Sequence, residues 1–249
     1  MGCAGPSGQH WGFDAPTLQR IGKAAVQAAT SPTVWGPTAG ALVFTIDDWD
    51  EKVSAWAAEN TPLFGSESRA AHVSDLLRGI AVGTATVAAV ATPTGHDGSY
   101  DLYNKLWDVG LGAGAVAVTS VVTESLKDVT NRDRPDGSDT RSFPSGHAST
   151  AAVTSTLALR YVDYYPFPAW GTLSLKGALI TLPYATGWAR IEANQHFPSD
   201  VLVGIALGNF FGTFVNALLK GGPEDQVRAV VTPTPEGLWL GVHVRFPAR

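Results

Sequence analysis

The chain is organised by three short polar blocks between residues 127 and 200. They read KDVTNRDRP at residues 127–135, PSGH at residues 144–147 and RIEANQHFPSD at residues 190–200. Together they hold several cations, two histidines, a carboxylate and a Pro-Ser-Gly turn. This combination suits a pocket that holds a tetrahedral oxyanion and attacks it with an imidazole. The rest of the chain is expected to form the scaffold around these blocks.

The cations of the first and third blocks are the expected ligands of that oxyanion. Lys127, Arg134 and Arg190 combine guanidinium forks with a point charge, and both suit the oxygens of a phosphoryl group. Arg132 and Arg141 belong to no such pattern, and we interpret them as solvated surface residues.

The second block is expected to begin a helix. A helix N-terminus offers unpaired N–H groups and the positive end of the helix dipole, so it binds anions. Gly146 would allow close backbone approach, and His147 would lie at the pocket mouth. Ser145 either adds a hydroxyl to the pocket or caps the helix, and both interpretations stay open.

The third block places His196 and Asp200 four residues apart. A carboxylate bound to one imidazole nitrogen sets the tautomer and leaves the other nitrogen free to attack. Taken alone, this spacing is more typical of a structural histidine. The other histidines have no such neighbours and are expected to be structural or solvent-facing: His10, His72, His96 and His243.

Taken jointly, the three blocks resemble the signature of the type 2 phosphatidic acid phosphatase (PAP2) superfamily. That signature is Lys-x6-Arg-Pro, then Pro-Ser-Gly-His, then Ser-Arg-x5-His-x3-Asp, and the resemblance covers roughly residues 109–219. The superfamily includes bacterial class A acid phosphatases, lipid phosphatases and vanadium haloperoxidases. The chain departs from the signature at Ala189, where the family usually has serine, and we expect a modest effect.

The resemblance implies a metal-independent phosphoric ester hydrolase that acts on a phosphomonoester or diphosphate, with a lipid phosphate among the candidate substrates. It implies that His196 is the nucleophile and forms a phosphohistidine, that Asp200 orients it, and that His147 is the general acid and then the base. It assigns the phosphate oxygens to Lys127, Arg134, Arg190 and the amides near Ser145 and Gly146. A bell-shaped pH profile between weakly acidic and neutral pH is expected.

Two alternatives remain open at this point. The same pocket could hold vanadate on His196, because trigonal-bipyramidal vanadate mimics the phosphoryl transition state. Vanadate would then be the cofactor of a haloperoxidase, whereas for a phosphatase it would be an inhibitor. The second alternative is a non-catalytic protein that retains the scaffold.

Composition excludes several other classes. The net charge of −5 and the pI of about 5.6 argue against a nucleic-acid partner, because duplex binding depends on basic residues. The single cysteine, Cys3, excludes an intramolecular disulfide framework. No histidine, cysteine or carboxylate cluster has zinc-ligand spacing, so no metal is expected. The sequence does not indicate an oligomeric state.

The predicted fold is an all-α helical bundle of the PAP2/haloperoxidase type with a small C-terminal β-hairpin. We expect a single domain over residues 1–249, with a flexible arm at 1–16 and the hairpin at 226–247, its apolar face packed on the helices. Apolar periodicity predicts helices at residues 17–29, 47–58, 67–91, 101–129, 146–161, 173–189 and 201–220, with Ser199 capping the last. Residues 35–46 form a short apolar run. The glycines between residues 110 and 114 would let another helix approach closely.

Membrane insertion is the remaining question. Residues 201–219 carry no charge and are long enough to cross a bilayer, but the apolar runs at 79–92 and 109–123 are shorter and rich in small residues. We therefore predict a soluble or peripherally anchored protein with buried core helices, periplasmic or otherwise extracytoplasmic. Met-Gly-Cys resembles the remnant of a processed lipoprotein, so Cys3 is a candidate lipid attachment point; a frayed terminal thiol is the alternative.

Overall fold

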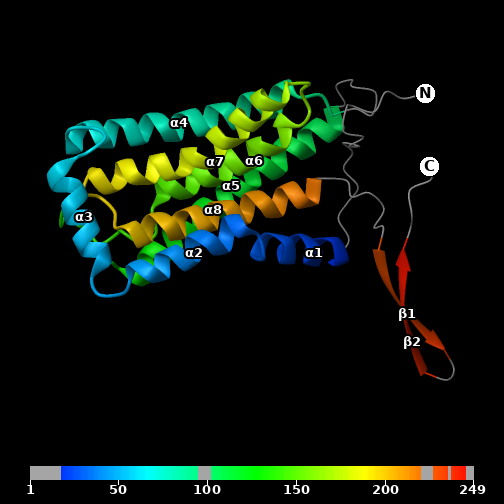
Figure 1. Ribbon diagram of the computed structural model, residues 1–249. Coiled ribbons are helices and arrows are strands. Elements are labelled where there is room, and N and C mark those ends of the chain that lie inside the picture. The colour runs from blue at the N-terminus through cyan, green and yellow to red at the C-terminus, as the bar shows by residue number, and fades with distance from the viewer. Residues whose placement is uncertain (1–17, 95–101, 220–226, 235–236, 245–249) are drawn as a thin grey trace.

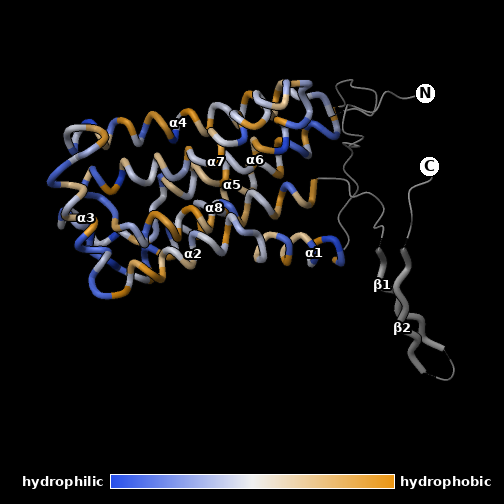
Figure 2. The backbone as a smooth tube through the Cα atoms, viewed as in Figure 1, coloured by the Kyte–Doolittle hydropathy of each residue, from blue (hydrophilic) through white to orange (hydrophobic). Residues whose placement is uncertain are grey.

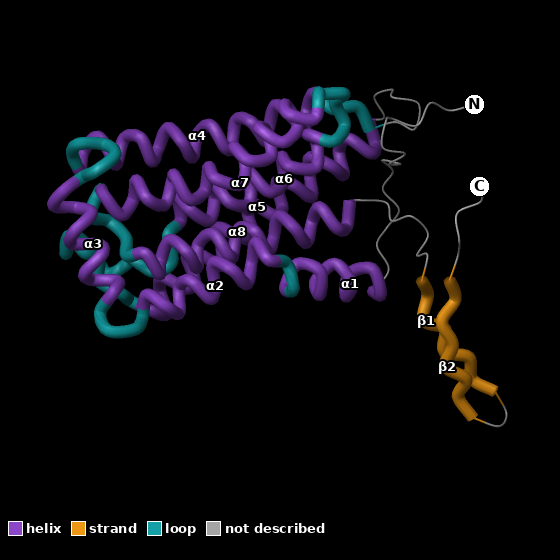
Figure 3. Tube along the Cα trace, viewed as in Figure 1, coloured by secondary structure: helices purple, strands orange, loops and turns teal. Residues whose placement is uncertain are grey.

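The structure is a computed structural model, and it describes residues 18–94, 102–219, 227–234 and 237–244. Within these residues the chain forms eight α-helices, most of them aligned along one axis (Figures 1 and 3). The helices are α1 Leu18–Ala29, α2 Pro32–Phe44, α3 Trp49–Asn60, α4 Glu67–Ala91, α5 Leu102–Thr130, α6 Gly146–Val162, α7 Ala169–Glu192 and α8 Pro198–Leu219. The predicted all-α helical fold class is confirmed.

Two short strands follow the helices. β1 Val227–Thr234 and β2 Gly237–Val244 pair antiparallel, with Val227 opposite Val244 and Thr234 opposite Gly237. They fall inside residues 226–247, where sequence alternation predicts strands. Their side chains lie outside those that the structure describes, so the packing of this pair on the helices stays a prediction. The predicted N-terminal arm at residues 1–16 also lies outside the described residues.

Local sequence explains where two helices begin differently from prediction. The apolar run at residues 35–46 is part of α2, which begins at Pro32 with Ser31 as its N-cap, since proline suits the first helical position. For the same reason α8 begins at Pro198, three residues before the predicted start. Ser199 therefore lies inside the first turn of α8 and is not the N-cap that we predicted.

A seam of glycines on α8 lets α6 and α8 approach each other closely. A Cβ atom at Gly204 would lie 2.6 Å from the carbonyl oxygen of Ser145, and one at Gly208 would lie 2.3 Å from that of Ser149. Gly212, one turn further on, would clash with Thr156 in the same way. The prediction that the α5 glycines serve this purpose is wrong: a Cβ atom at Gly110 or Gly114 would meet no described atom within 4 Å, and one at Gly112 would make an ordinary contact.

We predict that Gly208→Ala destabilises the bundle, by about 1–3 kcal/mol or more, because the added methyl would meet backbone atoms that cannot yield. Gly177→Ala in α7 is the matched control. A Cβ atom there would meet nothing within 4 Å, so this variant should gain about 0.5–1 kcal/mol. Thermal unfolding of both variants in detergent micelles measures the difference. Equal melting temperatures would show that the seam tolerates a side chain.

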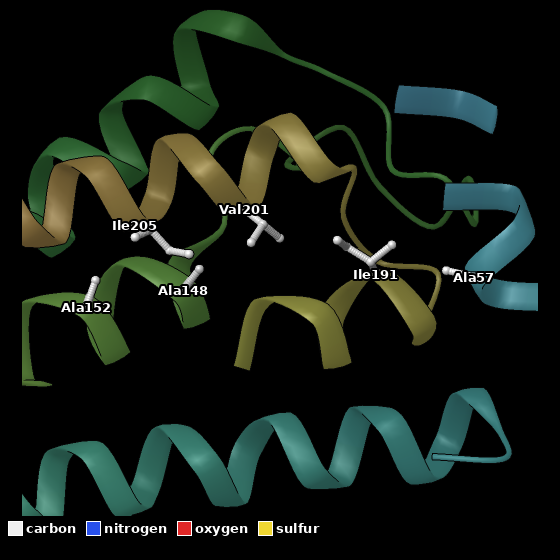
Figure 4. Close-up of a cluster of buried hydrophobic side chains, with 6 residues drawn as sticks. All are labelled: Ala57, Ala148, Ala152, Ile191, Val201 and Ile205. Carbon is white, nitrogen blue, oxygen red and sulfur yellow. The ribbon is translucent and has the colours of Figure 1, made fainter. Parts of the chain in front are cut away.

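A buried apolar cluster lies next to the polar blocks and joins four helices (Figure 4). Its members are Ala57, Ala148, Ala152, Ile191, Val201 and Ile205, which come from α3, α6, α7 and α8. Three of them directly follow residues of the blocks: Ala148 follows His147, Ile191 follows Arg190, and Val201 follows Asp200. Core packing therefore fixes the backbone from which these polar side chains project.

Glu192 ties the loop before α4 to the end of α7. Its carboxylate is fully buried and accepts hydrogen bonds from the backbone N–H groups of Leu63 and Phe64, each at 3.1 Å, and from the Trp188 indole. A buried carboxylate without such donors would be costly. This contact fixes the start of α4 beside the third polar block.

Three helices are long and apolar enough to cross a membrane: α4, α5 and α8. The apolar runs that appeared too short are parts of the 25-residue α4 and the 29-residue α5. These helices are not buried core helices, because only 11% of the apolar window of α4 and 17% of that of α5 is buried. Figure 2 shows apolar residues recurring along α4, whereas hydrophilic residues gather at the end of the bundle near α3.

Candidate active site

The three polar blocks meet at the hydrophilic end of the bundle, where α4, α6 and α8 begin and α5 and α7 end (Figure 1). They line a cavity of about 250 Å³, which we call the phosphate pocket. Six of the eight predicted site residues line it: Lys127, Arg134, Gly146, His147, Arg190 and His196. Residues outside the predicted set also line it: Arg78, Ser120, Thr123, Glu124, Ser149 and Thr150.

Ser145 and Asp200 support the pocket from behind its wall. Ser145 is fully buried and is the N-cap of α6, where its hydroxyl accepts a 3.5 Å hydrogen bond from the N–H of Ala148. The capping interpretation of this serine is therefore the one that the contacts support. Its own N–H donates to the carbonyl oxygen of Asp200 at 3.0 Å, which ties α6 to α8.

His196 is almost fully buried, with 2% of its surface exposed, and Asp200 lies on its Nδ1 side. The distance from His196 Nδ1 to Asp200 Oδ2 is 3.7 Å, which is longer than a hydrogen bond. The carboxylate thus faces Nδ1 and leaves Nε2 as the nitrogen available for chemistry. Burial lowers the pKa of His196, against the opposing effect of Asp200, so its imidazole is neutral near pH 7.

Asp200 is held by three donors. Arg132 Nη1 donates to Oδ1 at 2.7 Å, while the Ser142 hydroxyl at 2.6 Å and the Phe197 N–H at 2.8 Å both donate to Oδ2. With these bonds the carboxylate is fixed beside His196 even though it is completely buried.

Arg132 is therefore no solvated surface residue, and that interpretation is wrong. Its other guanidinium nitrogen donates to Asp50 Oδ2 at 3.0 Å, and its guanidinium lies 4.1 Å from the centre of the Phe197 ring. Asp50, from the first turn of α3, also accepts from the Ser199 N–H at 2.8 Å. No local pattern indicates this network, because Asp50 and Arg132 are 82 positions apart in the chain.

Arg141 does lie on the surface. Its side chain is 43% exposed and pairs with Glu124 and Asp128, which are also largely exposed. The prediction of a solvated surface residue is thus correct for Arg141 and wrong for Arg132.

The cations of the pocket each have a nearby acceptor. Lys127 Nζ lies 2.8 Å from Glu124, and Arg134 Nε lies 2.6 Å from Asp139. Arg190 Nη1 donates to the Ser74 hydroxyl at 3.3 Å. Burial, and then repulsion by Arg134, lowers the pKa of Arg190 to about 10, so it is still charged at neutral pH. With Arg78, which also lines it, the pocket therefore presents four positive groups to an anion.

His147 pairs with a carboxylate that sequence reasoning missed. Its Nε2 lies 2.7 Å from Asp75 Oδ1 on α4. Burial lowers the pKa of His147 to about 4, Arg190 and Arg78 act in the same direction, and Asp75 opposes them. Asp75 lies outside all three blocks. The sequence shows it only as one carboxylate on the helix predicted at residues 67–91, with no pattern that links it to His147.

We predict that Asp75→Asn lowers the pKa of His147 further, because it removes the carboxylate that favours the charged ring. Protonated His147 is lost as the pH rises, so the basic limb of the kcat/KM profile should move to lower pH. The loss should be larger for an alkyl phosphate than for p-nitrophenyl phosphate, whose leaving group needs less protonation.

The matched control for this variant is Glu59→Gln on α3, an exposed carboxylate far from the pocket-lining residues in the chain. Profiles for both variants are measured on the two substrates. An unchanged basic limb in Asp75→Asn would show that Asp75 does not act through His147.

Two sequence predictions stay untested. Ala189 is buried on α7 beside Arg190, and the modest effect expected from the missing serine hydroxyl stays a prediction. Within the described part of the chain, no group of three or more histidine, cysteine, aspartate or glutamate residues is placed to hold a metal ion. Metal independence itself remains a prediction.

Comparison with known proteins identifies the class. Residues 108–221, a little under half of the chain, match the family model of the PAP2 superfamily. The match covers all three polar blocks, and the recognised resemblance is confirmed.

Two curated relatives are named as phosphatases, and both names include a lipid. The chain is 40% identical over 81 residues to the lipid A 1-phosphatase of Porphyromonas gingivalis, covering 32% of this chain and 17% of that protein. It is 32% identical over 126 residues to the decaprenylphosphoryl-5-phosphoribose phosphatase of Mycobacterium tuberculosis, covering 47% of this chain and 63% of that protein. The chain thus spans less than two thirds of the length of either.

The fold is also found in a solved structure. The first transmembrane PAP2 type phosphatidylglycerolphosphate phosphatase from Bacillus subtilis superposes with a TM-score of 0.55 at 22% identity, covering 75% of this chain and 95% of that one. The predicted periplasmic or extracytoplasmic location, with peripheral attachment through Cys3, is wrong. The finding that overturns it is the presence of three candidate membrane spans, α4, α5 and α8, in a fold shared with a transmembrane phosphatase. Cys3 itself lies outside the described residues.

Proposed function

We propose that this protein is a metal-independent lipid-phosphate phosphatase that works through a phosphohistidine on His196. The observation that carries the proposal is the phosphate pocket, where two histidines and four cations line one cavity at the polar end of a bundle with three candidate membrane spans. The names of the two curated relatives support a lipid phosphate as substrate.

The proposed reaction begins with phosphate binding. Lys127, Arg134 and Arg190 hold the non-bridging oxygens, together with the free N–H groups at the start of α6. These charges stabilise the phosphoryl group while it is transferred from the leaving-group oxygen to His196 Nε2 and then to a water oxygen.

His196 Nε2 then attacks phosphorus, and the bond from phosphorus to the leaving alkoxide breaks. His147 gives its proton to that oxygen, so the alcohol leaves neutral. Because burial lowers the pKa of His147 to about 4, the protonated ring is a minority form at neutral pH, and this step favours acidic pH. In the second step His147 takes a proton from water, the water oxygen bonds to phosphorus, and the phosphorus–nitrogen bond breaks. Inorganic phosphate is released, and His196 is neutral again with Asp200 on its Nδ1 side.

Phosphate release from a substrate panel tests this function. The protein is purified in detergent and assayed with EDTA on phosphatidate, phosphatidylglycerol phosphate, a polyprenyl diphosphate and p-nitrophenyl phosphate. We expect release that survives EDTA and a higher kcat/KM on a lipid substrate than on p-nitrophenyl phosphate. Release that EDTA abolishes would refute metal independence, and absence of release from every substrate would refute the phosphatase proposal.

A further inference from the structure

α4 presents a polar face to the phosphate pocket that belongs to none of the three polar blocks. Ser74 and Asp75 lie four and three residues before Arg78, so all three side chains project from one side of the helix. Ser74 accepts a hydrogen bond from Arg190, and Asp75 Oδ1 lies 2.7 Å from His147 Nε2. Arg78 lines the pocket itself. This face therefore adds a cation to those that the blocks supply.

The guanidinium of Arg78 is held only weakly. Its Nη2 lies 3.3 Å from Asp75 Oδ1, the same oxygen that His147 Nε2 approaches more closely. The side chains of Arg78 and Asp75 are 40% and 58% exposed. Exposed ion pairs of this kind are weak, because water screens the two charges. Arg78 can therefore exchange this contact for an oxyanion of a bound ligand.

Arg78 lies on the side of the pocket where the leaving group departs. In the proposed reaction His147 meets the oxygen that joins phosphorus to the leaving group. Arg78 contacts the same carboxylate oxygen as His147, so its guanidinium lies next to that position. The other three cations of the pocket come from the last turns of α5 and α7 and from the loop between α5 and α6: Lys127, Arg190 and Arg134. They match the three non-bridging oxygens of the transferred phosphoryl group.

The protonation state of His147 favours a leaving group that needs no proton. Burial, Arg190 and Arg78 lower the pKa of His147 to about 4, and Asp75 opposes them. Protonated His147 is therefore scarce at neutral pH, whereas an alkoxide needs a proton in order to leave. A phosphate monoester loses its last proton at about pH 6, so it leaves readily as an anion. Such a leaving group needs a cation beside it instead of an acid.

We propose that Arg78 determines substrate specificity by binding the second phosphate of a lipid diphosphate at the leaving-group position. This inference rests on the proposed function and adds a substrate class to it: diphosphates on a prenyl or other lipid chain. His196 Nε2 bonds to the terminal phosphorus, the bond from that phosphorus to the bridging oxygen breaks, and the bridging oxygen keeps the electron pair. A lipid monophosphate leaves, with its new negative charge held by Arg78. Water then releases phosphate from His196 as in the proposed reaction.

Arg78→Gln tests the proposal, because it removes the charge and keeps a polar side chain of similar reach. Arg69→Gln is the matched control on the same helix. Arg69 is exposed, does not line the pocket, and donates to the carbonyl oxygen of Phe64 at 3.4 Å. Both variants and wild type are assayed in mixed micelles at pH 7 on farnesyl diphosphate and farnesyl phosphate. Initial phosphate release gives kcat/KM for each substrate.

We expect Arg78→Gln to lower kcat/KM for farnesyl diphosphate by about tenfold to a hundredfold, the effect of one lost charge-assisted hydrogen bond. Its kcat/KM for farnesyl phosphate should not fall. Without Arg78 the pKa of His147 rises, so more of the acid is protonated at neutral pH. Arg69→Gln should keep both wild-type values.

Arg78→Lys keeps the charge without the fork, and its value for farnesyl diphosphate should lie between those of wild type and Arg78→Gln. Thermal unfolding checks that the variants fold, and Arg78→Lys decides the comparison if Arg78→Gln does not fold. An equal loss on both substrates would show that Arg78 holds the transferred phosphate, and would overturn the proposal. Unchanged values on both would overturn it as well. Failure of the proposed function differs from either result, because wild type would then release no phosphate from any substrate.

Discussion

Replacing His196 with alanine is expected to reduce kcat for phosphate release by at least about a thousandfold, because no other group in the mechanism can bond to phosphorus. His196 lines the phosphate pocket with Asp200 on its Nδ1 side, and its neutral imidazole is ready to attack. Since the side chain is buried, His196→Gln is made alongside it to keep most of the volume.

His72→Ala is the control for these variants. His72 is exposed on α4 and does not line the phosphate pocket, so its loss should leave kcat within about twofold of wild type. Phosphate release and thermal unfolding are measured for all three variants. A His196 variant that folds and keeps more than a tenth of the wild-type kcat would remove His196 from the proposed chemistry.

Replacing Arg132 with alanine is expected to cost about 3–5 kcal/mol of unfolding free energy, because two buried carboxylates lose their common cation. Asp50 and Asp200 are 3% and 0% exposed, and Arg132 donates to both. Activity should fall too, since Asp200 would no longer be held beside His196. Arg132→Lys keeps the charge but not the fork, and we expect an intermediate loss.

Arg141→Ala separates this effect from the general loss of an arginine. Arg141 forms exposed pairs, and such pairs contribute about 0–1 kcal/mol. Denaturant unfolding in a fixed detergent compares the two alanine variants. Equal destabilisation would mean that the buried network around Asp50 and Asp200 does not depend on Arg132.

The helices were largely predictable because most of them carry a strong local signal. α4 runs from Glu67 to Ala91 as predicted, and α6 begins at the Pro-Ser-Gly-His turn. The first residue of a helix was harder to predict, because it depends on proline and on the capping residues. The predicted start of α8 was wrong by three residues. The close approach of helices was not predictable from glycine content alone, because it depends on which glycines face a neighbour: those of α8 do, and Gly110 and Gly114 do not.

The candidate site likewise contains some residues that could be predicted from the sequence and some that could not. The three polar blocks supplied most of the pocket lining, because each block is compact in sequence and has a recognisable chemistry. Asp75 and Arg132 were missed for the opposite reason. Each acts through a partner far away in the chain, 72 positions for Asp75 and His147 and 68 for Arg132 and Asp200. The packing of α4 against α6 brings Asp75 to His147, and the packing of α5 against α8 brings the loop that holds Arg132 to Asp200.

The membrane assignment failed because it treated apolar runs as isolated stretches. Interrupted runs in α4 and α5 belong to helices that are long enough to span. Charges in these helices line the phosphate pocket: Arg78 lies midway along α4, and Lys127 lies in the last turn of α5.

Trapping the covalent intermediate tests the central claim most directly. His147→Ala is mixed with p-nitrophenyl phosphate carrying a radiolabelled phosphoryl group, and the reaction is quenched in alkali, which preserves phosphohistidine. The nitrophenolate leaves without an acid, whereas hydrolysis of the intermediate lacks its base, so label should accumulate on the protein and map to His196. Phosphate release without any protein-bound label, or label on a residue other than His196, would contradict the proposed mechanism.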